Sequence, residues 1–367
     1  MRWPNPTDYQ DAVQNPRTCF HDPELKAGQV ALLPMGLPRV ASGNFASVYE
    51  IQTGTKRWAV RCFLRQAADQ QRHYEHVSRH LEALWLPFLV RFEYQPLGIR
   101  IVGQTYPIVK MQWVNGVGLH SYIKKQVRRP QSLLALAAQW LSMMNSLHGS
   151  HMAHGDLQHG NVMVTSGGFI RLVDYDAMVV PALRGTPCAE FGHANYQHPQ
   201  RASLDNAPHL DYFAALVIYI SLRGLAAEPK LWDKFHTGDN LIFSASDFKN
   251  PTKSELFQQC SRSPDPLLRA LADKLANWCS GSAALTTNLE TLLGYLLPAA
   301  AQAGASAPLP TVPPAAPSAP PEPPSGLLRV QRGGSWKDDR TVLTAIHRKG
   351  HPQARWLPTI GFRCVAL

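Results

Sequence analysis

The sequence predicts an α+β protein with two lobes, a small β-rich lobe followed by a helical lobe. First, residues 45–52 and 57–63 are rich in β-branched and aromatic side chains and flank a Thr-Gly-Thr turn, which is typical of a β-hairpin. Second, helical patterns dominate beyond Pro130, and the apolar residues of 132–150 recur along one helical face. Third, the composition changes abruptly at residue 298. We expect a cleft between the two lobes.

Between the hairpin and the helical lobe, the pattern of 67–86 predicts a helix, and 99–114 predicts two further strands around Gly103-Gln104. Residues 298–326 contain ten of the 30 prolines, so we expect an extended Pro/Ala-rich linker there. These features divide the chain into an N-terminal extension (1–37), a main domain (38–297), the linker, and a short β-containing tail (327–367).

The formal charge of +10 suggests nucleic-acid binding, but most of this charge lies in the tail. Residues 327–367 have eight Lys/Arg and only two Asp/Glu, so the main domain is close to neutral and a nucleic-acid partner is not expected. The most apolar stretch, 212–222, is interrupted by Arg223 and is too short to span a bilayer, so we expect no membrane contact. The six scattered cysteines fit reduced thiols in a cytoplasmic protein.

The most informative stretch is HGDLQHGN at 154–161, followed after a short interval by VDYD at 173–176. In order and spacing, these residues resemble the catalytic loop and the metal-binding motif of the protein kinase superfamily. The resemblance extends over about 38–297 and implies a bilobal kinase-like fold. It also implies that Asp156 orients the incoming hydroxyl, and that Asn161 and Asp174 hold Mg²⁺ against the phosphates of ATP.

Other segments match the same family in the right order. SGNFASVYEI at 42–51 resembles the glycine-rich loop over the nucleotide, WAVRCF at 58–63 the strand with the phosphate-binding cation, and PIVKMQWVNG at 107–116 the linker that contacts adenine. Asp211 resembles the buried Asp that anchors the catalytic loop. The resemblance thus implies further nucleotide contacts from Gly43, Asn44, Phe45, Val48, Ala59, Arg61, Met111, Gln112 and Val114.

Several positions depart from the family's pattern. Arg61 stands where the family has Lys, with Glu75 as its expected ion-pair partner; a planar guanidinium is not equivalent to a compact ammonium. Gln158 replaces a residue that is usually cationic and so removes one charge facing the transferred phosphate. Asp176 adds a carboxylate that either joins the metal site or faces solvent.

Two further departures concern regulation and substrate docking. Gly155 replaces an Arg that, in many kinases, pairs with a phosphorylated activation loop, so we expect no dependence on loop phosphorylation. GHANYQHPQ at 192–200 takes the place of the family's substrate-docking loop.

The tail resembles a second family. RVQRGGSW at 329–336 and IGFRCV at 360–365 are similar to the C-terminal part of the formylglycine-generating-enzyme family, a C-type-lectin-like fold that variable proteins of diversity-generating retroelements also use. The rest of that fold has no counterpart here, and an isolated hairpin is only marginally stable in water. The tail is therefore a binding element for a protein partner, a remnant, or an appendage of the main domain.

The resemblances imply an ATP- and Mg²⁺-dependent kinase that phosphorylates Ser or Thr hydroxyls of a protein substrate. Two alternatives remain open. One is a pseudokinase scaffold that binds nucleotide weakly or not at all and presents the tail to a partner, which the replacements at Arg61, Gln158 and the loop glycines favour. The other is a kinase-fold enzyme that acts on a small molecule.

Overall fold

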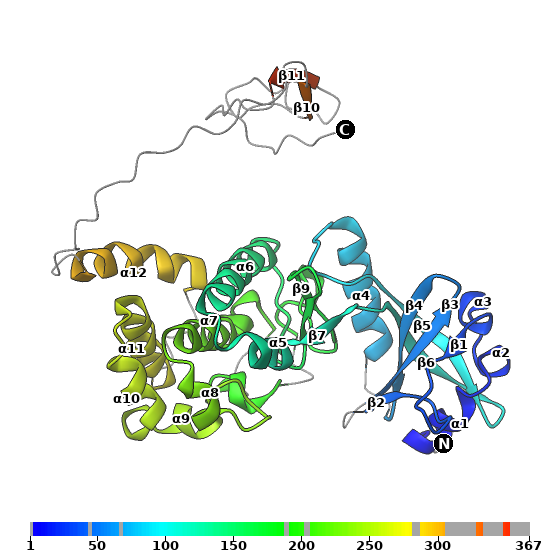
Figure 1. The fold of residues 1–367 in the computed structure, drawn as a ribbon. Coiled ribbons are helices and arrows are strands. Elements are labelled where there is room, and N and C mark those ends of the chain that lie inside the picture. The colour runs from blue at the N-terminus through cyan, green and yellow to red at the C-terminus, as the bar shows by residue number, and fades with distance from the viewer. Residues whose placement is uncertain are drawn as a thin grey trace. The chain divides into compact units, whose positions relative to one another are not determined.

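The protein is represented by a computed structural model, which describes residues 3–42, 46–65, 69–186, 191–201, 206–280, 287–304, 328–332 and 348–352. The chain divides into two compact units, Met1–Ala307 and Pro308–Leu367. The first unit contains both expected lobes, with the β-rich N-lobe beside the helical lobe (Figure 1). The expected α+β, bilobal architecture is confirmed.

The N-lobe is built on a six-stranded antiparallel sheet with the order β1-β3-β4-β6-β5, in which β2 also pairs with β3. A two-residue turn at Gly54-Thr55 joins β3 to β4, as the hairpin prediction requires. The second predicted pair of strands is also present, although its first strand begins earlier than expected. The strands are β1 (Gln29–Val30), β2 (Val40–Ser42), β3 (Ala46–Thr53), β4 (Lys56–Phe63), β5 (Phe92–Ile101) and β6 (Gln104–Gln112).

The N-terminal segment packs onto one face of this sheet (Figure 1). Its short helices bring Tyr9, Val13, Phe20 and Leu25 to the sheet, where all four are buried. The burial of each such apolar side chain contributes about 1.5–3 kcal/mol. The segment that contains these helices therefore contributes to the N-lobe core. The helices are α1 (Pro6–Ala12), α2 (Pro16–Cys19) and α3 (Pro23–Lys26).

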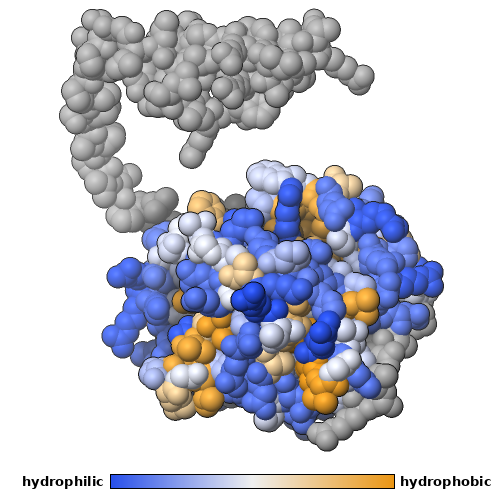
Figure 2. Space-filling view, turned by 90° about the vertical axis from the view of Figure 1, so that its right-hand side faces the viewer, coloured by the Kyte–Doolittle hydropathy of each residue, from blue (hydrophilic) through white to orange (hydrophobic). Residues whose placement is uncertain are grey.

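Polar contacts fasten the same segment. The buried Lys110 Nζ on β6 lies 2.9 Å from Asp22 Oδ2 and 2.8 Å from Glu24 Oε2, and Tyr9 Oη donates to the carbonyl of Phe63 at 2.6 Å. The surface seen from the N-lobe side is mostly hydrophilic, with separate apolar patches (Figure 2). Such a surface fits a sheet whose apolar face has been covered.

Helix α4 (Gln70–Ala83) lies against the opposite face of the sheet, at the junction with the helical lobe (Figure 1). The predicted helix is thus confirmed with shorter bounds. Because side chains alternate along a strand, Cys62 faces the N-terminal segment, whereas Arg61 and Phe63 face α4 and the cleft.

The helical lobe carries a small sheet of β7 (Gly116–Gly118), β8 (Val162–Thr165) and β9 (Ile170–Leu172). Helices α6 and α7 pack together beneath it, and Trp140 of α6 donates from Nε1 to the carbonyl of Ala215 at 3.0 Å. The helices are α5 (Leu119–Gln126), α6 (Pro130–Gly149), α7 (Tyr212–Ala227), α8 (Lys230–Phe235), α9 (Ala245–Lys249), α10 (Glu255–Ser261), α11 (Pro266–Ser280) and α12 (Leu289–Gly304).

By length and composition, the helical stretch Pro208–Ala227 could cross a membrane. However, 78% of its apolar window is buried inside the protein, where it forms the centre of the helical lobe. Its hydrophobicity is accounted for by this packing.

Two expectations about the C-terminal part need comment. Helix α12 continues through Pro298 to Gly304, so the start of the expected linker is helical; alanine, which fills this stretch, is the strongest helix former. In the second unit, β10 (Leu328–Arg332) pairs with β11 (Arg348–Pro352) as an antiparallel hairpin. The rest of the tail and of the linker lies outside the described residues, so the lectin-like resemblance stays a prediction.

Candidate active site

The catalytic-loop segment is held from below by one buried carboxylate. Asp211, which precedes α7, accepts hydrogen bonds from the backbone N–H of His154 at 2.5 Å and of Gly155 at 2.9 Å. The side chain of His154 then donates from Nε2 to the carbonyl of Val173 at 3.0 Å. The two motifs are therefore joined directly, and Asp211 lies where the sequence placed it.

Asp156 projects from this loop and is half-buried. Its Oδ2 accepts hydrogen bonds from Gln158 Nε2 and Asn161 Nδ2, both at 2.9 Å, and its Oδ1 accepts one from the backbone N–H of His193 at 2.8 Å. Three donors fix the carboxylate in one orientation. Because Asn161 uses its amide nitrogen for Asp156, its amide oxygen is the atom left for another ligand.

Gly155 has a structural reason to be glycine. Its φ is +78°, and a β-carbon at this position would overlap the carbonyl oxygen of Ala177. An arginine, as found at this place in many kinases, does not fit this backbone.

The docking-loop segment approaches Asp156 equally closely. Gly192 has a φ of +71°, and a β-carbon there would lie 2.8 Å from Asp156 Oδ1 and 2.5 Å from Gln197 Nε2. The glycine therefore lets the backbone N–H of His193 reach the carboxylate.

Asp174 follows β9 and has a left-handed backbone conformation, with a φ of +66°. The next residue, Tyr175, is buried and bridges the lobes, since its hydroxyl donates to the carbonyl of Leu172 at 2.9 Å and accepts from the N–H of Val90 at 2.6 Å. This anchor fixes the carboxylate of Asp174 at the floor of the cleft.

A cavity of about 320 Å³ opens between the lobes above Asp174. It is lined by eight of the predicted nucleotide contacts: Val48, Ala59, Arg61, Met111, Gln112, Val114, Asn161 and Asp174. Trp113, inside the predicted adenine-contacting segment from Gln112 to Val114, also lines the cavity. The other lining residues include Ala41, Tyr74, Val109, Met163 and Tyr175, which were not among the predicted contacts. The predicted contacts Gly43, Asn44 and Phe45 lie outside the described residues. Asp156 and Gln158 lie beside the cavity, next to Asn161.

The connection between the lobes forms one wall of this cavity. The N–H of Gln112 donates to the carbonyl of Arg91 at 3.2 Å, and that of Trp113 to the carbonyl of Arg57 at 2.9 Å. Both N–H donors are thus used within the protein. Val114 is therefore the residue of this segment whose main chain we expect to contact adenine.

Arg61 has different partners from the expected one. Its Nη1 lies 2.7 Å from Asp174 Oδ1, and its Nη2 donates to Asp176 Oδ2. Glu75 is exposed and accepts from Gln71 Nε2 at 2.8 Å, so the expected Arg61–Glu75 ion pair is wrong for this structure. Of the two alternatives for Asp176, the solvent-facing one is wrong, because its carboxylate is largely buried and engaged by Arg61.

The site keeps a positive charge despite its burial. Burial alone would lower the pKa of Arg61, but the neighbouring carboxylates of Asp174 and Asp176 hold the pKa above its ordinary value. The guanidinium of Arg61 therefore stays positively charged, with the carboxylates of Asp174 and Asp176 beside it.

Two buried atoms test whether the site fits a metal ion and a nucleotide. Arg61 Nε and Asp174 Oδ1 have no hydrogen-bond partner among the described residues, although Asp174 Oδ1 is in ion-pair range of Arg61. The unpaired Nε of Arg61 fits a phosphate oxygen, and Asp174 Oδ1, which contacts the guanidinium of Arg61, fits a cation in place of that contact. No three His, Cys, Asp or Glu side chains in the described part of the chain form a metal site. Asn161 and Asp174 would thus share Mg²⁺ with phosphate oxygens.

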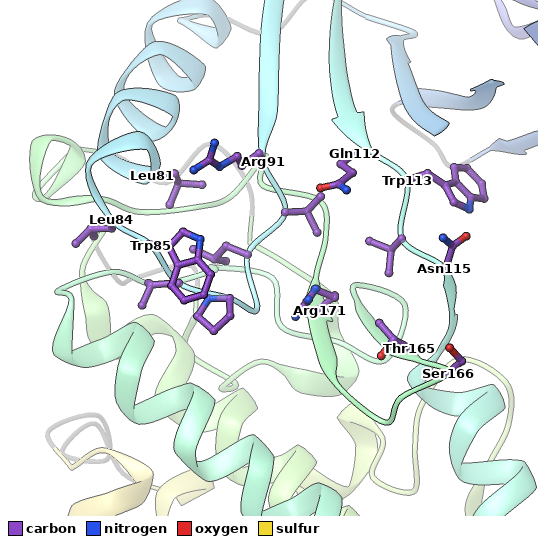
Figure 3. A pocket seen from close by; sticks show the side chains of 15 residues that line it. Leu81, Leu84, Trp85, Arg91, Gln112, Trp113, Asn115, Thr165, Ser166 and Arg171 are labelled. Carbon is purple, nitrogen blue, oxygen red and sulfur yellow. The ribbon is translucent and has the colours of Figure 1, made fainter. Parts of the chain in front are cut away.

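A second cavity, of about 450 Å³, lies behind the interlobe connection (Figure 3). Trp85 stands at one side of it, and Trp113 and Asn115 at the other. Although it is larger, its lining contains no carboxylate, cysteine or histidine, so the smaller cavity is the better candidate for chemistry.

Comparison with known proteins agrees with this geometry. Residues 37–179 match the family described as protein tyrosine and serine/threonine kinase. This part of the chain is thus similar to protein kinases. The matched residues contain β4 with Arg61, helix α4, the interlobe connection and the two motifs at 154–161 and 173–176.

Curated proteins that are similar to this chain include bacterial serine/threonine-protein kinases. PknA of Corynebacterium glutamicum is 28% identical over 105 residues, which cover 27% of this chain and 22% of the relative. A Lactococcus lactis protein named "Probable serine/threonine-protein kinase PknB" is 28% identical over 134 residues, which cover 34% of this chain and 21% of the relative. The chain thus spans only about a fifth of the length of these kinases.

Proposed function

We propose that the chain is an ATP- and Mg²⁺-dependent protein kinase that transfers the γ-phosphoryl group to Ser or Thr hydroxyls of a protein substrate in the cytoplasm. The observation that carries the proposal is the hydrogen bond from Asn161 to Asp156. This hydrogen bond lies at the edge of the cavity, which Asn161 and Asp174 line. A potential base is thereby placed beside two oxygen ligands for a hard cation. The names of the curated relatives support Ser and Thr as acceptors.

In this proposal each side chain has a distinct task. Asp156 orients the acceptor hydroxyl and takes its proton, while Gln158 and Asn161 keep the carboxylate in place. Arg61 binds phosphate oxygens, and Asn161 and Asp174 would hold Mg²⁺, which neutralises phosphate charge when bound. Gln158 carries no charge, so we expect slower transfer than a cationic residue would support.

The test is a transfer assay with γ-labelled ATP, Mg²⁺ and generic protein acceptors. Asp156→Ala and Asp174→Ala serve as matched controls. We expect label on protein Ser or Thr with the wild type and background label with both variants. Equal incorporation by all three proteins would refute the proposed function.

A second candidate is a pseudokinase scaffold, in which the tail at 327–367 is presented to a protein partner. The observation that favours it is the ion pair of Arg61 with Asp174, because the metal-binding carboxylate is already occupied by a cation. Thermal unfolding separates the two candidates through linkage. ATP raises the melting temperature of a kinase more when Mg²⁺ is present, whereas a scaffold shows no Mg²⁺-dependent increment.

A further inference from the structure

We propose that Asp176, supported by Tyr74, is the positioning residue that holds the phosphate-binding cation Arg61, in place of a carboxylate on α4. This inference rests on the proposed function, since it assigns the support of one residue in that site. The resemblance to kinases gives the support of Arg61 to Glu75 and no such role to Asp176 or Tyr74.

Both oxygens of Asp176 are engaged. Oδ2 accepts from Arg61 Nη2, and Oδ1 accepts from the hydroxyl of Tyr74. The Asp176 side chain is 13% exposed and that of Arg61 15%, so the pair is largely shielded from solvent. Charge-assisted hydrogen bonds in such surroundings are stronger and more directional than those between neutral groups.

Tyr74 is itself fixed. It is buried on α4, and its ring stacks on Tyr94 of β5 with the centroids 5.2 Å apart and the planes at 9°. The preceding residue, His73, donates from Nε2 to the carbonyl of Tyr175 at 3.1 Å. Helix α4 thus binds the segment Asp174-Tyr175-Asp176 through two consecutive side chains, those of His73 and Tyr74.

These two hydrogen bonds explain why Glu75 cannot serve as the partner of Arg61. Successive residues of a helix point about 100° apart, so a helix that turns His73 and Tyr74 toward the cleft turns Glu75 away from it. Rotation of α4 to bring Glu75 inward would withdraw Tyr74 from Asp176. The two supports for the cation are mutually exclusive.

The shape of arginine suits the observed support. A guanidinium has separate nitrogens that can bind two carboxylates and still retain a donor, whereas an ammonium is a point charge. Here Nη1 faces Asp174 and Nη2 faces Asp176, while Nε has no hydrogen-bond partner in the described part of the chain. Asp174 is also assigned to the metal ion, so we assign the support of Arg61 to Asp176.

The test measures the affinities of the full-length protein for Mg²⁺ with adenylyl imidodiphosphate, and for adenosine, by calorimetry. Adenosine lacks phosphates, so the ratio of the two affinities reports on the phosphate and Mg²⁺ contacts, to which Arg61 contributes. We expect Asp176→Asn to weaken binding of the phosphate-bearing ligand by about tenfold, the loss of one charge-assisted hydrogen bond. Adenosine binding should be unchanged, and Glu75→Gln should behave as the wild type.

Two further variants sharpen the test. Tyr74→Phe keeps the ring stacking and should reproduce the Asp176→Asn effect in weaker form, which preserves a result if Asp176→Asn does not fold. The double variant Arg61→Met/Asp176→Asn should lose no more affinity than Arg61→Met alone, because both substitutions remove one interaction.

The outcomes distinguish this inference from the function on which it depends. If Asp176→Asn and Tyr74→Phe leave the affinity ratio unchanged, or if Glu75→Gln alone lowers it, the positioning role is overturned and the kinase proposal stands. If the wild type binds adenylyl imidodiphosphate no more tightly than adenosine, Arg61 does not bind phosphate, and the inference and the proposed function both fail.

Discussion

The two sides of the cleft differ in how closely they follow the kinase pattern. On the helical side, Asp211 holds the loop that carries Asp156 and Asn161, and these two side chains are hydrogen-bonded to each other. On the N-lobe side, the cation is an arginine and its partner comes from the metal-motif segment instead of α4. A catalytic loop is built from contacts that short spacing already specifies, whereas the support of Arg61 depends on the rotation of a distant helix.

The largest expected effect tests the helical side. Asp156→Asn keeps the shape of the side chain but removes the base, so we predict a fall in phosphoryl transfer of about 10²–10⁴-fold. The measurement is the initial rate with labelled ATP, and Glu75→Gln is the control from the N-lobe side. A variant that retains full activity would show that the helical side does not carry the chemistry.

The next prediction concerns the anchor beneath the loop. Asp211→Ala leaves the N–H groups of His154 and Gly155 buried without partners, so we predict a loss of about 2–4 kcal/mol in the free energy of unfolding. Urea denaturation measures it. Asp239→Ala, at a side chain that is 75% exposed, is the matched control and should change stability by less than about 0.5 kcal/mol. Similar losses in both variants would mean that the anchor is dispensable.

The two sides should also differ in their response to pH. Burial, together with His120 and His193, lowers the pKa of His159 in the catalytic loop from 6.5 to about 4. Between these values the unfolded chain binds a proton that the folded protein does not, so stability falls as the pH drops from about 6.5 to 4, by at most about 3 kcal/mol. Melting temperatures between pH 7.5 and 4.5 should show this slope.

The control for the pH effect is His159→Gln, which should reduce the slope but not abolish it, since burial also lowers the pKa of His73 and His148. In the N-lobe the pKa of Asp22 is lowered, because hydrogen bonds led by Lys110 outweigh the opposing effect of burial. The stability from Asp22 is therefore present above pH about 4 and is lost below it. An identical slope in wild type and His159→Gln would contradict the assignment.

The smallest expected effect concerns the N-terminal segment that packs onto the N-lobe sheet. Asp22→Ala removes one of the two carboxylates at the buried Lys110, so we predict a loss of about 1–2 kcal/mol, because Glu24 remains. Chemical denaturation provides the value, and phosphoryl transfer should remain close to wild type. A large fall in phosphoryl transfer with unchanged stability would mean that the N-terminal segment influences activity in the cleft.

The sequence predicted local features better than distant ones. The hairpin around Gly54, helix α6 and the Asp156–Asn161 loop follow from patterns within a few residues, and the structure contains each of them. The Tyr74–Asp176 contact joins residues 102 positions apart, and no spacing rule specifies which face of α4 meets the cleft. The family pattern therefore suggested Glu75.

The N-terminal segment shows the same limit. A boundary at residue 38 follows from the resemblance, yet Tyr9 and Phe20 pack against strands that come later in the chain. The pattern 1–37 contains only short apolar runs, and their partners become visible only after the sheet has formed.

The packing of the first helices onto strands β3 to β6 sets the order in which the N-lobe can fold. Lys110 meets Asp22 across 88 positions of the chain, so a ribosome must release both ends of that interval before the lobe can close. Until then the earliest residues have nothing to fold upon. An expression clone that starts at the apparent domain boundary would leave Tyr49, Ile51 and Val60 facing water and would be prone to aggregate.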